Sequence, residues 1–225
     1  SLVLSLNLVQ APQGAAAWLP AQTVGKGSEP CLVADDRGNV YIGTQSPVAV
    51  YMSHDWGATW TGKTDWPNAF CDPVVFTLPN GQLHVIYLKN GVQGIVTWTS
   101  QDFGKTFTSA GSLSGPLDRE WIARSPDGTL SIVYSHGYIG GPRATGIFLA
   151  QSKDNGKTFQ QTTQVAPSNE VYEMVDPYLQ SGPDGKLYAM WAASKDRKNI
   201  QEYWFAASSD GGKSFSKPYS VAKTH

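Results

Sequence analysis

Apolar and polar residues alternate along most of this chain in short segments bounded by glycine, asparagine or aspartate. Examples are "NVYIG" at 39–43 and "LHVIYL" at 83–88. A period of two places successive side chains on opposite faces of a β-strand. No segment has the 3.6-residue period of an amphipathic helix. The pattern therefore predicts an all-β protein built from many short strands.

Two turn signals recur along the chain in a fixed order. The first is a glycine turn that precedes an alternating segment, at Gly38, Gly81, Gly128 and Gly185. The second, which we call the aspartate hairpin, reads S-x-D-x-G-x-(S/T)-(W/F) and occupies 53–60, 100–107, 152–159 and 208–215. Its aspartates Asp55, Asp102, Asp154 and Asp210 are separated by 47, 52 and 56 residues. Repetition over such distances is typical of solenoids and propellers.

Each repeat contains four predicted strands, with the glycine turn after the first and the aspartate hairpin between the third and the fourth. A four-stranded antiparallel unit that recurs along the chain favours a β-propeller over a sandwich or a barrel. The predicted blades occupy 28–66, 67–115, 116–168 and 169–225.

The N-terminal residues 1–27 resemble half of a further blade. The segment "APQGAAAW" at 11–18 aligns with 53–60, and Trp18 keeps the aromatic position. Because four and a half blades do not close by themselves, we expect the chain to be part of a larger ring completed by a further segment or chain. The alternative is a closed four-bladed ring with an N-terminal decoration.

The aspartate hairpin has a structural explanation. Its carboxylate can accept hydrogen bonds from turn amides and from the flanking hydroxyls. The glycines Gly57, Gly104, Gly156 and Gly212 fit a left-handed turn position. The aromatic residues Trp60, Phe107, Phe159 and Phe215 are expected to fill the space beside the neighbouring sheet.

These four segments resemble the Asp-box, or BNR repeat, of sialidase-like β-propellers. The resemblance covers residues 28–223, nearly the whole chain. It implies a propeller fold, but not an activity, because Asp-boxes also occur in propellers that are not hydrolases. It also implies that function lies on the face opposite the aspartate hairpins.

Composition narrows the range of partners. The chain of 225 residues has a formal net charge of −1 and only 16% charged residues. No basic patch predicts nucleic-acid binding, and no apolar run predicts membrane insertion. The two cysteines, Cys31 and Cys71, begin successive inner strands, so we expect them to form a disulfide. The protein is expected to be secreted, periplasmic or on the cell surface.

Aligning the blades on the glycine turn identifies one column of candidate residues at the start of the innermost strands. The column reads Glu29, Asp72, Arg119 and Asp176, with Glu120 after the arginine. These side chains are expected to surround the mouth of the central channel, where converging charges mark a candidate site. The structural alternative is that each carboxylate satisfies backbone amides of its own loop. Calcium binding by the three acids is a further alternative, and otherwise no cofactor is expected.

Other candidates lie on the same predicted face. His136 borders a glycine-rich loop, Trp66 has the chemistry to stack on a sugar, and Tyr178 follows Asp176 closely. Asp72 and Asp176 are a conceivable carboxylate pair for glycoside hydrolysis.

The sialidase resemblance also implies a clamp of three arginines, a tyrosine nucleophile helped by a glutamate, and an Arg-Ile-Pro element. That element is absent from the sequence, where "GSEP" occupies the comparable place. Arg119, Arg143 and Arg197 map to the expected face. The tyrosine nucleophile would be Tyr172 or Tyr178, and its glutamate would be Glu170 or Glu173.

The sequence therefore favours a binding or structural module that presents a glycan or protein ligand site opposite the aspartate hairpins. The alternative is a sialidase-like glycoside hydrolase acting on a terminal sugar.

Overall fold

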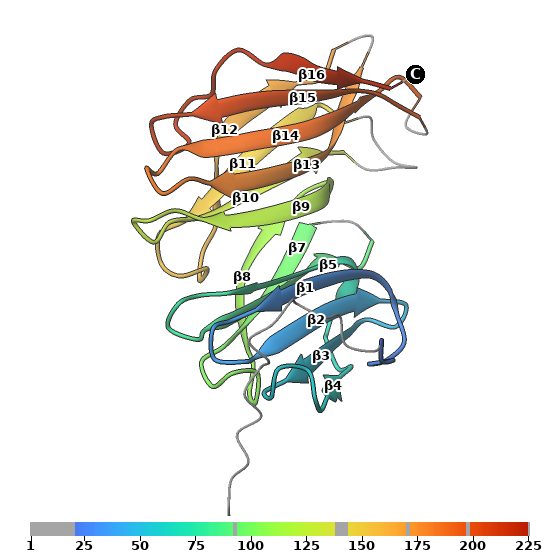
Figure 1. Ribbon diagram of the computed structural model, residues 1–225. Helices are drawn as coiled ribbons and strands as arrows, with labels where there is room; N and C mark the ends of the chain where they lie inside the picture. Colours follow the sequence, from blue (N-terminus) through green and yellow to red (C-terminus); the bar gives the residue numbers. More distant parts are fainter. Residues whose placement is uncertain (1–20, 92–93, 138–143, 170–171, 197–198, 225) are drawn as a thin grey trace, which may run out of the picture.

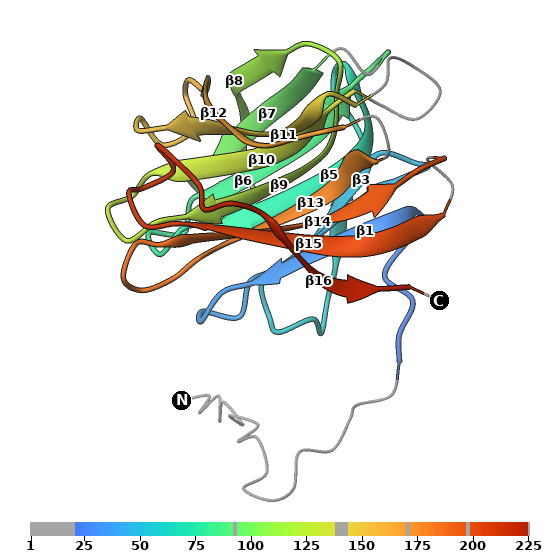
Figure 2. The ribbon, with the colours of Figure 1, turned by 90° about the horizontal axis from the view of Figure 1, so that it is seen from above.

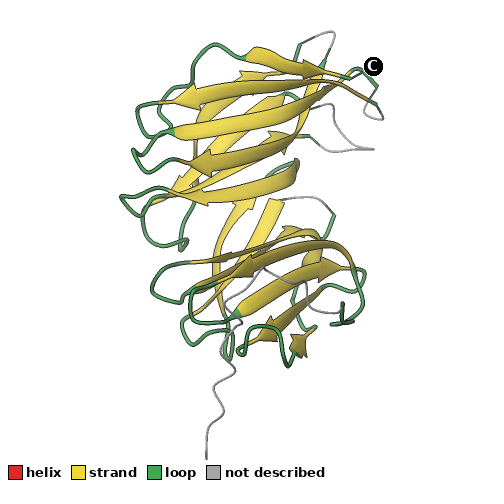
Figure 3. Ribbon diagram, in the orientation of Figure 1, coloured by secondary structure: helices red, strands yellow, loops and turns green. Residues whose placement is uncertain are grey.

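The computed structural model describes residues 21–91, 94–137, 144–169, 172–196 and 199–224. These residues form sixteen strands and no helix (Figure 3). None of the described residues belongs to a helix long and apolar enough to cross a membrane. The prediction of an all-β protein is confirmed.

The strands form four antiparallel sheets of four strands each, in the order of the chain. Blade 1 consists of β1 (Ser28–Ala34), β2 (Val40–Gln45), β3 (Ala49–Ser53) and β4 (Thr61–Lys63). Blade 2 consists of β5 (Ala69–Thr77), β6 (Leu83–Lys89), β7 (Gly94–Ser100) and β8 (Thr108–Ser114). Blade 3 consists of β9 (Leu117–Arg124), β10 (Leu130–His136), β11 (Gly146–Ser152) and β12 (Gln160–Pro167). Blade 4 consists of β13 (Glu173–Ser181), β14 (Leu187–Ser194), β15 (Ile200–Ser208) and β16 (Tyr219–Lys223).

The four sheets are arranged as the blades of a β-propeller, as predicted. Figure 1 shows blades 3 and 4 in the upper half of the molecule and blades 1 and 2 in the lower half. In the view from above, β16 lies at the outer edge of the sheet that begins with β13 (Figure 2). The first strands of consecutive blades also contact one another, β1 with β5, β5 with β9 and β9 with β13, so the first strand of every blade is the inner one.

The hydrophobic core of the described residues consists of three clusters, which lie between blades 1 and 2, blades 2 and 3, and blades 3 and 4. Val50, Tyr87 and Trp98 belong to the cluster that joins blades 1 and 2. Similar clusters join blade 2 to blade 3 and blade 3 to blade 4. The hairpin aromatics Phe107, Phe159 and Phe215 each pack into the cluster shared with the preceding blade. Their predicted role as fillers between sheets is confirmed.

In the part of the chain that the structure describes, blade 1 and blade 4 each have one sheet face that no other blade covers, the face opposite blade 2 and the face opposite blade 3. Among the described residues, no cluster of buried side chains joins blade 4 to blade 1. Tyr178, Met190 and Tyr219 lie in one cross-strand row of blade 4 that also contains Phe205. These three side chains are 43%, 43% and 55% exposed, and Leu32 of blade 1 is 63% exposed. That a further segment or chain completes the ring stays a prediction.

The half blade predicted at 1–27 lies mostly outside the described residues. Residues 21–27 are described and contain no strand. They run along blade 1, where the amide of Lys26 donates a hydrogen bond to Tyr51 Oη and Gln22 donates to the carbonyl of Gly57.

The aspartate hairpins have the predicted internal contacts. In the first hairpin, Thr59 donates to Asp55 through its amide at 2.8 Å and through its hydroxyl at 2.6 Å. Ser53 donates to Asp55 at 2.8 Å and accepts the amide of Gly57 at 2.8 Å. The same contacts recur in the other three hairpins. Each hairpin is therefore a locally satisfied turn.

These hydrogen bonds also set the acidity of the hairpins. The pKa of Asp55 and that of Asp102 are lowered to about 2, chiefly by the hydroxyl of the following threonine. The pKa of Asp154 is lowered to about 2, chiefly by Ser152.

The sequence did not indicate that the residue between aspartate and glycine also has a left-handed backbone, as at Trp56, Phe103 and Asn155.

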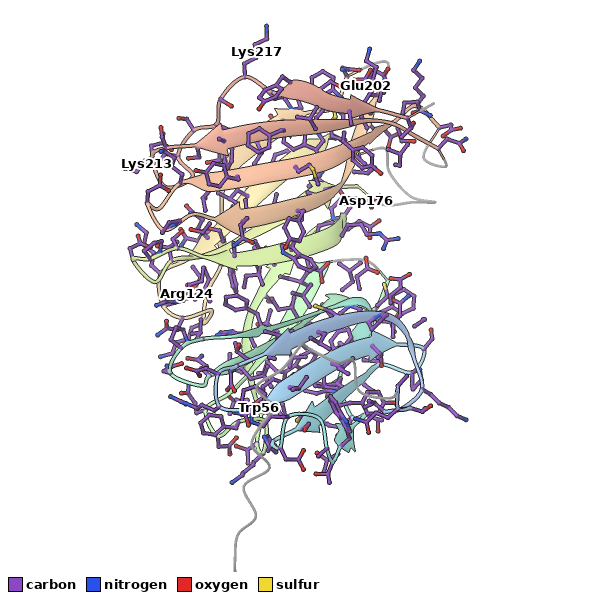
Figure 4. The ribbon with its side chains drawn as sticks, viewed as in Figure 1. Trp56, Arg124, Asp176, Glu202, Lys213 and Lys217 are labelled. Atoms are coloured by element: carbon purple, nitrogen blue, oxygen red, sulfur yellow. The ribbon has the colours of Figure 1, made fainter. Side chains whose placement is uncertain are left out.

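The two ends of the blades differ as expected. The amide of Trp56, in the first aspartate hairpin, donates to the carbonyl of Gly38 in the glycine turn of the same blade. Figure 4 labels Asp176 at one end of blade 4 and Lys213, in the aspartate hairpin, at the other end. The inner strands therefore begin at the end opposite the hairpins.

Candidate functional site

A β-bulge interrupts the inner strand of every blade at the same place. In blade 1, Ser28 pairs with Gln45 and Cys31 with Gly43, so Glu29 and Pro30 together lie opposite one residue. The equivalent bulges contain Asp72 and Pro73 in blade 2, Arg119 and Glu120 in blade 3, and Asp176 and Pro177 in blade 4. Proline lacks a backbone N–H, so it fits a position that donates nothing to the ladder. The bulge explains why proline follows the acid in three blades.

The first bulge residue of each blade has a left-handed backbone. The φ angles are +47° at Glu29, +52° at Asp72, +55° at Arg119 and +49° at Asp176. Non-glycine residues rarely adopt this region, and such strain concentrates at functional sites. We call these four residues the channel mouth.

The structure brings the four channel-mouth side chains together around Arg119. Its Nη1 lies 3.5 Å from Glu29 Oε2, and its Nε lies 3.7 Å from Asp72 Oδ2 and 3.4 Å from Asp176 Oδ1. The side chains of Glu29 and Asp176 are 46% and 50% exposed, whereas that of Asp72 is 13% exposed. One guanidinium thus faces three carboxylates from three other blades.

Glu120 occupies the bulge position that is proline elsewhere. It is 3% exposed, and neither of its carboxyl oxygens has a hydrogen-bond partner in the part of the chain that the structure describes. Burial raises the pKa of Glu120 well above its ordinary value, and the charges of Asp72 and Asp118 raise it further. The surroundings of Glu120 therefore favour the protonated form of its carboxyl more than water does.

The channel mouth contains three carboxylates and one guanidinium, and the carboxylates affect the acidity of their neighbours. Burial raises the pKa of Asp72, and the charge of Arg119 lowers it only in part. Burial, followed by the charges of Asp72 and Glu120, raises the pKa of the nearby Cys71 thiol to about 12.

A pocket of about 650 Å³ opens at the channel mouth. Its polar lining consists of the four channel-mouth residues and Glu120. Its apolar lining includes Leu32, Trp121 and Tyr178. The rings of Trp121 and Tyr178 lie 4.6 Å apart with an interplanar angle of 35°. An exposed aromatic wall therefore stands beside a group of carboxylates.

The structure places two other predicted site residues elsewhere, which corrects the sequence analysis. Trp66 is only 6% exposed, and it packs against Trp98 and Phe107 in the core between blades 1 and 2. It cannot stack on a sugar. His136 lies at the end of β10, where its Nδ1 is 3.0 Å from Thr145 Oγ1, and it does not line the pocket.

The elements of a sialidase site are not assembled in the described residues. Arg143, Arg197 and Glu170 lie outside them. The hydroxyl of Tyr172 is 3.4 Å from Glu202, and Glu173 accepts the amide of Ala144. The tyrosine–glutamate pair stays a prediction.

The cysteines and the metal prediction have different outcomes. Cys31 and Cys71 are free thiols, so the expected disulfide is absent from the structure and that prediction is wrong. The two inner strands instead bring both side chains against the core shared by blades 2 and 3.

Among the described residues no cluster of three or more histidine, cysteine or acidic side chains is arranged to hold a metal ion. Calcium binding stays a prediction.

Sequence reasoning missed Trp121, which forms half of the aromatic wall. The signal available was its place in the third repeat, directly after the bulge. Tyr178 occupies the same place after the bulge of blade 4.

At the level of sequence, no protein-family model and no curated protein matches this chain. Solved structures match it in fold. An alpha-L-arabinanase of Penicillium chrysogenum, complexed with arabinobiose, has a TM-score of 0.65 and 16% identity over 85% of this chain and 65% of that one. A Dyadobacter fermentans protein of unknown function has a TM-score of 0.63 and 17% identity over 87% of this chain and 69% of that one. An exo-beta-1,3-galactanase of Phanerochaete chrysosporium has a TM-score of 0.59 and 12% identity over 85% of this chain and 49% of that one.

These similarities establish the propeller fold and leave the activity open, because one fold hosts many functions. The chain also spans only 65% of the arabinanase and 49% of the galactanase.

Proposed function

We propose that this protein is a glycan-binding module whose ligand occupies the pocket at the channel mouth. The pocket is the observation that carries the proposal. It joins an aromatic wall, formed by Tyr178 over Trp121, to hydrogen-bonding groups contributed by all four blades. Sugars present an apolar C–H face and a ring of hydroxyls, so a site of this composition matches them on both sides.

The fold neighbours support the choice of ligand class. Two of them are named as an arabinanase and a galactanase, and the arabinanase structure contains arabinobiose. We further propose that the chain belongs to the Asp-box propellers, on the strength of four hairpins with the same hydrogen bonds. A module that binds extracellular or surface glycans would be secreted, periplasmic or displayed on the cell.

Binding is favoured over sialidase-type catalysis because of Arg119. A sialidase-like clamp needs arginines free to grip a substrate carboxylate. Arg119 already lies within 3.7 Å of three carboxylates of the protein itself.

The proposal is tested by binding of the full chain to an array of neutral, acidic and basic glycans. We expect saturable binding to at least one class, weakened at least tenfold by Tyr178→Ala. The matched control is Tyr219→Ala, which removes another exposed tyrosine of blade 4 outside the pocket. Absence of binding to every glycan, or equal loss in both variants, would overturn the proposal.

A second candidate function is glycoside hydrolysis, which Glu120 specifically favours. Burial and the charge of Asp72 raise the pKa of Glu120, and a carboxyl with a raised pKa near a second carboxylate is the pairing that acid–base chemistry on glycosides requires. Release of reducing sugar from a bound glycan, abolished by Glu120→Gln even when the glycan concentration is raised to saturate the variant, would support this function. Binding without turnover would exclude it for that glycan.

A further inference from the structure

We infer that the glycan bound at the channel mouth carries a positively charged amino group. This inference rests on the proposed function and specifies its ligand as a basic amino sugar. It follows from the excess of carboxylates, the engagement of Arg119, the buried position of Glu120 and the aromatic wall, which are taken in turn below.

The first observation is the charge of the surface that a ligand meets. Glu29 and Asp176 expose about half of their side chains at the pocket, and Asp72 lies between them. Arg119 supplies one positive charge against these three negative charges. A cationic ligand is attracted to the remaining negative charge, whereas an acidic sugar is repelled.

The second observation is that Arg119 is held by the protein. Its Nη1 and its Nε already face carboxylates from blades 1, 2 and 4 at 3.4 to 3.7 Å. A ligand carboxylate would have to displace these partners and would leave their charges uncompensated. An ammonium group needs no such displacement, because it adds a partner for carboxylates that Arg119 satisfies only in part.

The third observation is the position of Glu120. Its side chain lines the pocket and is 97% buried, since its exposed fraction is 3%. Both carboxyl oxygens lack a hydrogen-bond partner among the described residues. A buried polar group without a partner costs free energy, so its place in a pocket indicates a ligand group that completes it.

The contrast with the other blades strengthens this reading of Glu120. Pro30, Pro73 and Pro177 fill the equivalent bulge position, and proline would leave no orphaned polar atoms there. Blade 3 therefore departs from the repeat at a position that faces the pocket. Such departures from a locally consistent pattern are expected at functional sites.

The aromatic wall completes the match to an amino sugar. Tyr178 is 43% exposed and is backed by Trp121, so its ring is available to a ligand. The C–H face of a sugar packs on such a ring, and a nearby ammonium group gains from the negative face of the aromatic system. Carboxylates and an aromatic ring thus converge on one cationic sugar.

The experiment compares glycans that share a β-1,4-linked pyranose backbone and carry basic, neutral or acidic substituents. The full chain is titrated by calorimetry with β-1,4-linked trimers of glucosamine, N-acetylglucosamine, glucose and glucuronic acid. Any glycan that binds on the array is also titrated, once in its native form and once with an added amino group. We expect each amino form to bind about tenfold more tightly than its neutral counterpart, and the acidic trimer to bind most weakly. The preference should decrease with added salt.

Matched variants locate the preference. Glu29→Gln combined with Asp176→Asn removes two exposed carboxylates, so the amino and neutral forms should then bind within about twofold of each other. The control pair, Asp36→Asn with Asp184→Asn, removes the same charge at the opposite end of the blades and should leave the preference intact. Glu120→Leu should weaken the amino form more than the neutral form.

The outcomes separate this inference from the proposed function. Neutral or acidic glycans that bind the pocket as tightly as amino glycans would overturn the inference and leave glycan binding standing. A preference that survives in the double channel-mouth variant would also overturn it. Absence of binding by any glycan would overturn both.

Discussion

Replacing Arg119 with glutamine removes the one positive charge among the channel-mouth residues. The substitution keeps a polar but shorter side chain and leaves Glu29, Asp72 and Asp176 facing one another without a cation. The three ion pairs of Arg119 have N–O distances of 3.4 to 3.7 Å, and the Arg119 side chain is 41% exposed. Ion pairs of this exposure contribute about 0.2–1 kcal/mol each, so the free energy of unfolding should fall by roughly 1–2 kcal/mol at pH 7.

The loss should depend on pH, and its sign follows from Asp72. The pKa of Asp72 is raised by burial, and Arg119 counteracts that rise. Without Arg119 the pKa rises further, so the folded variant binds more protons than the unfolded chain as the pH falls from 7 toward 4. Stability of the variant should therefore recover, relative to the unsubstituted protein, over this range.

Urea denaturation at pH 7 and pH 4, each at low and high salt, measures the effect. Arg37→Gln is the control, because it removes a positive charge at the hairpin end of blade 1. A deficit for Arg119→Gln that is the same at both pH values and at both salt concentrations would refute the electrostatic account. Arg119 would then act through packing alone.

Two further substitutions test the core and the hairpins. His84 is 1% exposed, burial lowers its pKa to about 4 from 6.5, and the unfolded chain therefore takes up a proton first as the pH falls. The free energy of unfolding should fall by roughly 3 kcal/mol between pH 6.5 and pH 4. His84→Leu should remove this pH dependence in urea titrations. If the dependence is unchanged in the variant, His84 is not its source. Ser100→Ala removes the acceptor of the Gly104 amide at 2.8 Å and should cost about 1–3 kcal/mol in the same assay, whereas a cost near zero would mean that the hairpin does not depend on this bond.

The features that could be predicted from the sequence are those set by local contacts or by the repeat itself. The aspartate hairpin closes its hydrogen bonds within eight residues, as from Ser53 to Trp60, so its pattern is legible in the chain. The channel-mouth column was predictable because equal positions in a radial repeat meet at the axis. Arg119 lies in contact with acids of the three other blades for that reason.

The features that could not be predicted depend on packing between distant segments. Trp66 follows blade 1 in a polar loop, but its ring turns into the core beside Trp98, more than thirty residues later in the sequence. Cys31 and Cys71 occupy successive inner strands, yet their relation is set by bulges that the alternating pattern does not reveal. The burial of Glu120 likewise arises from the bulge and from the strands around it.

Hydrogen–deuterium exchange with and without a bound glycan tests most directly that the ligand site lies at the channel mouth. The account predicts protection at the four bulges, within 28–32, 71–74, 118–121 and 176–178, and unchanged exchange in the aspartate hairpins. Protection confined to the hairpins at 53–60, 100–107, 152–159 and 208–215 would contradict it.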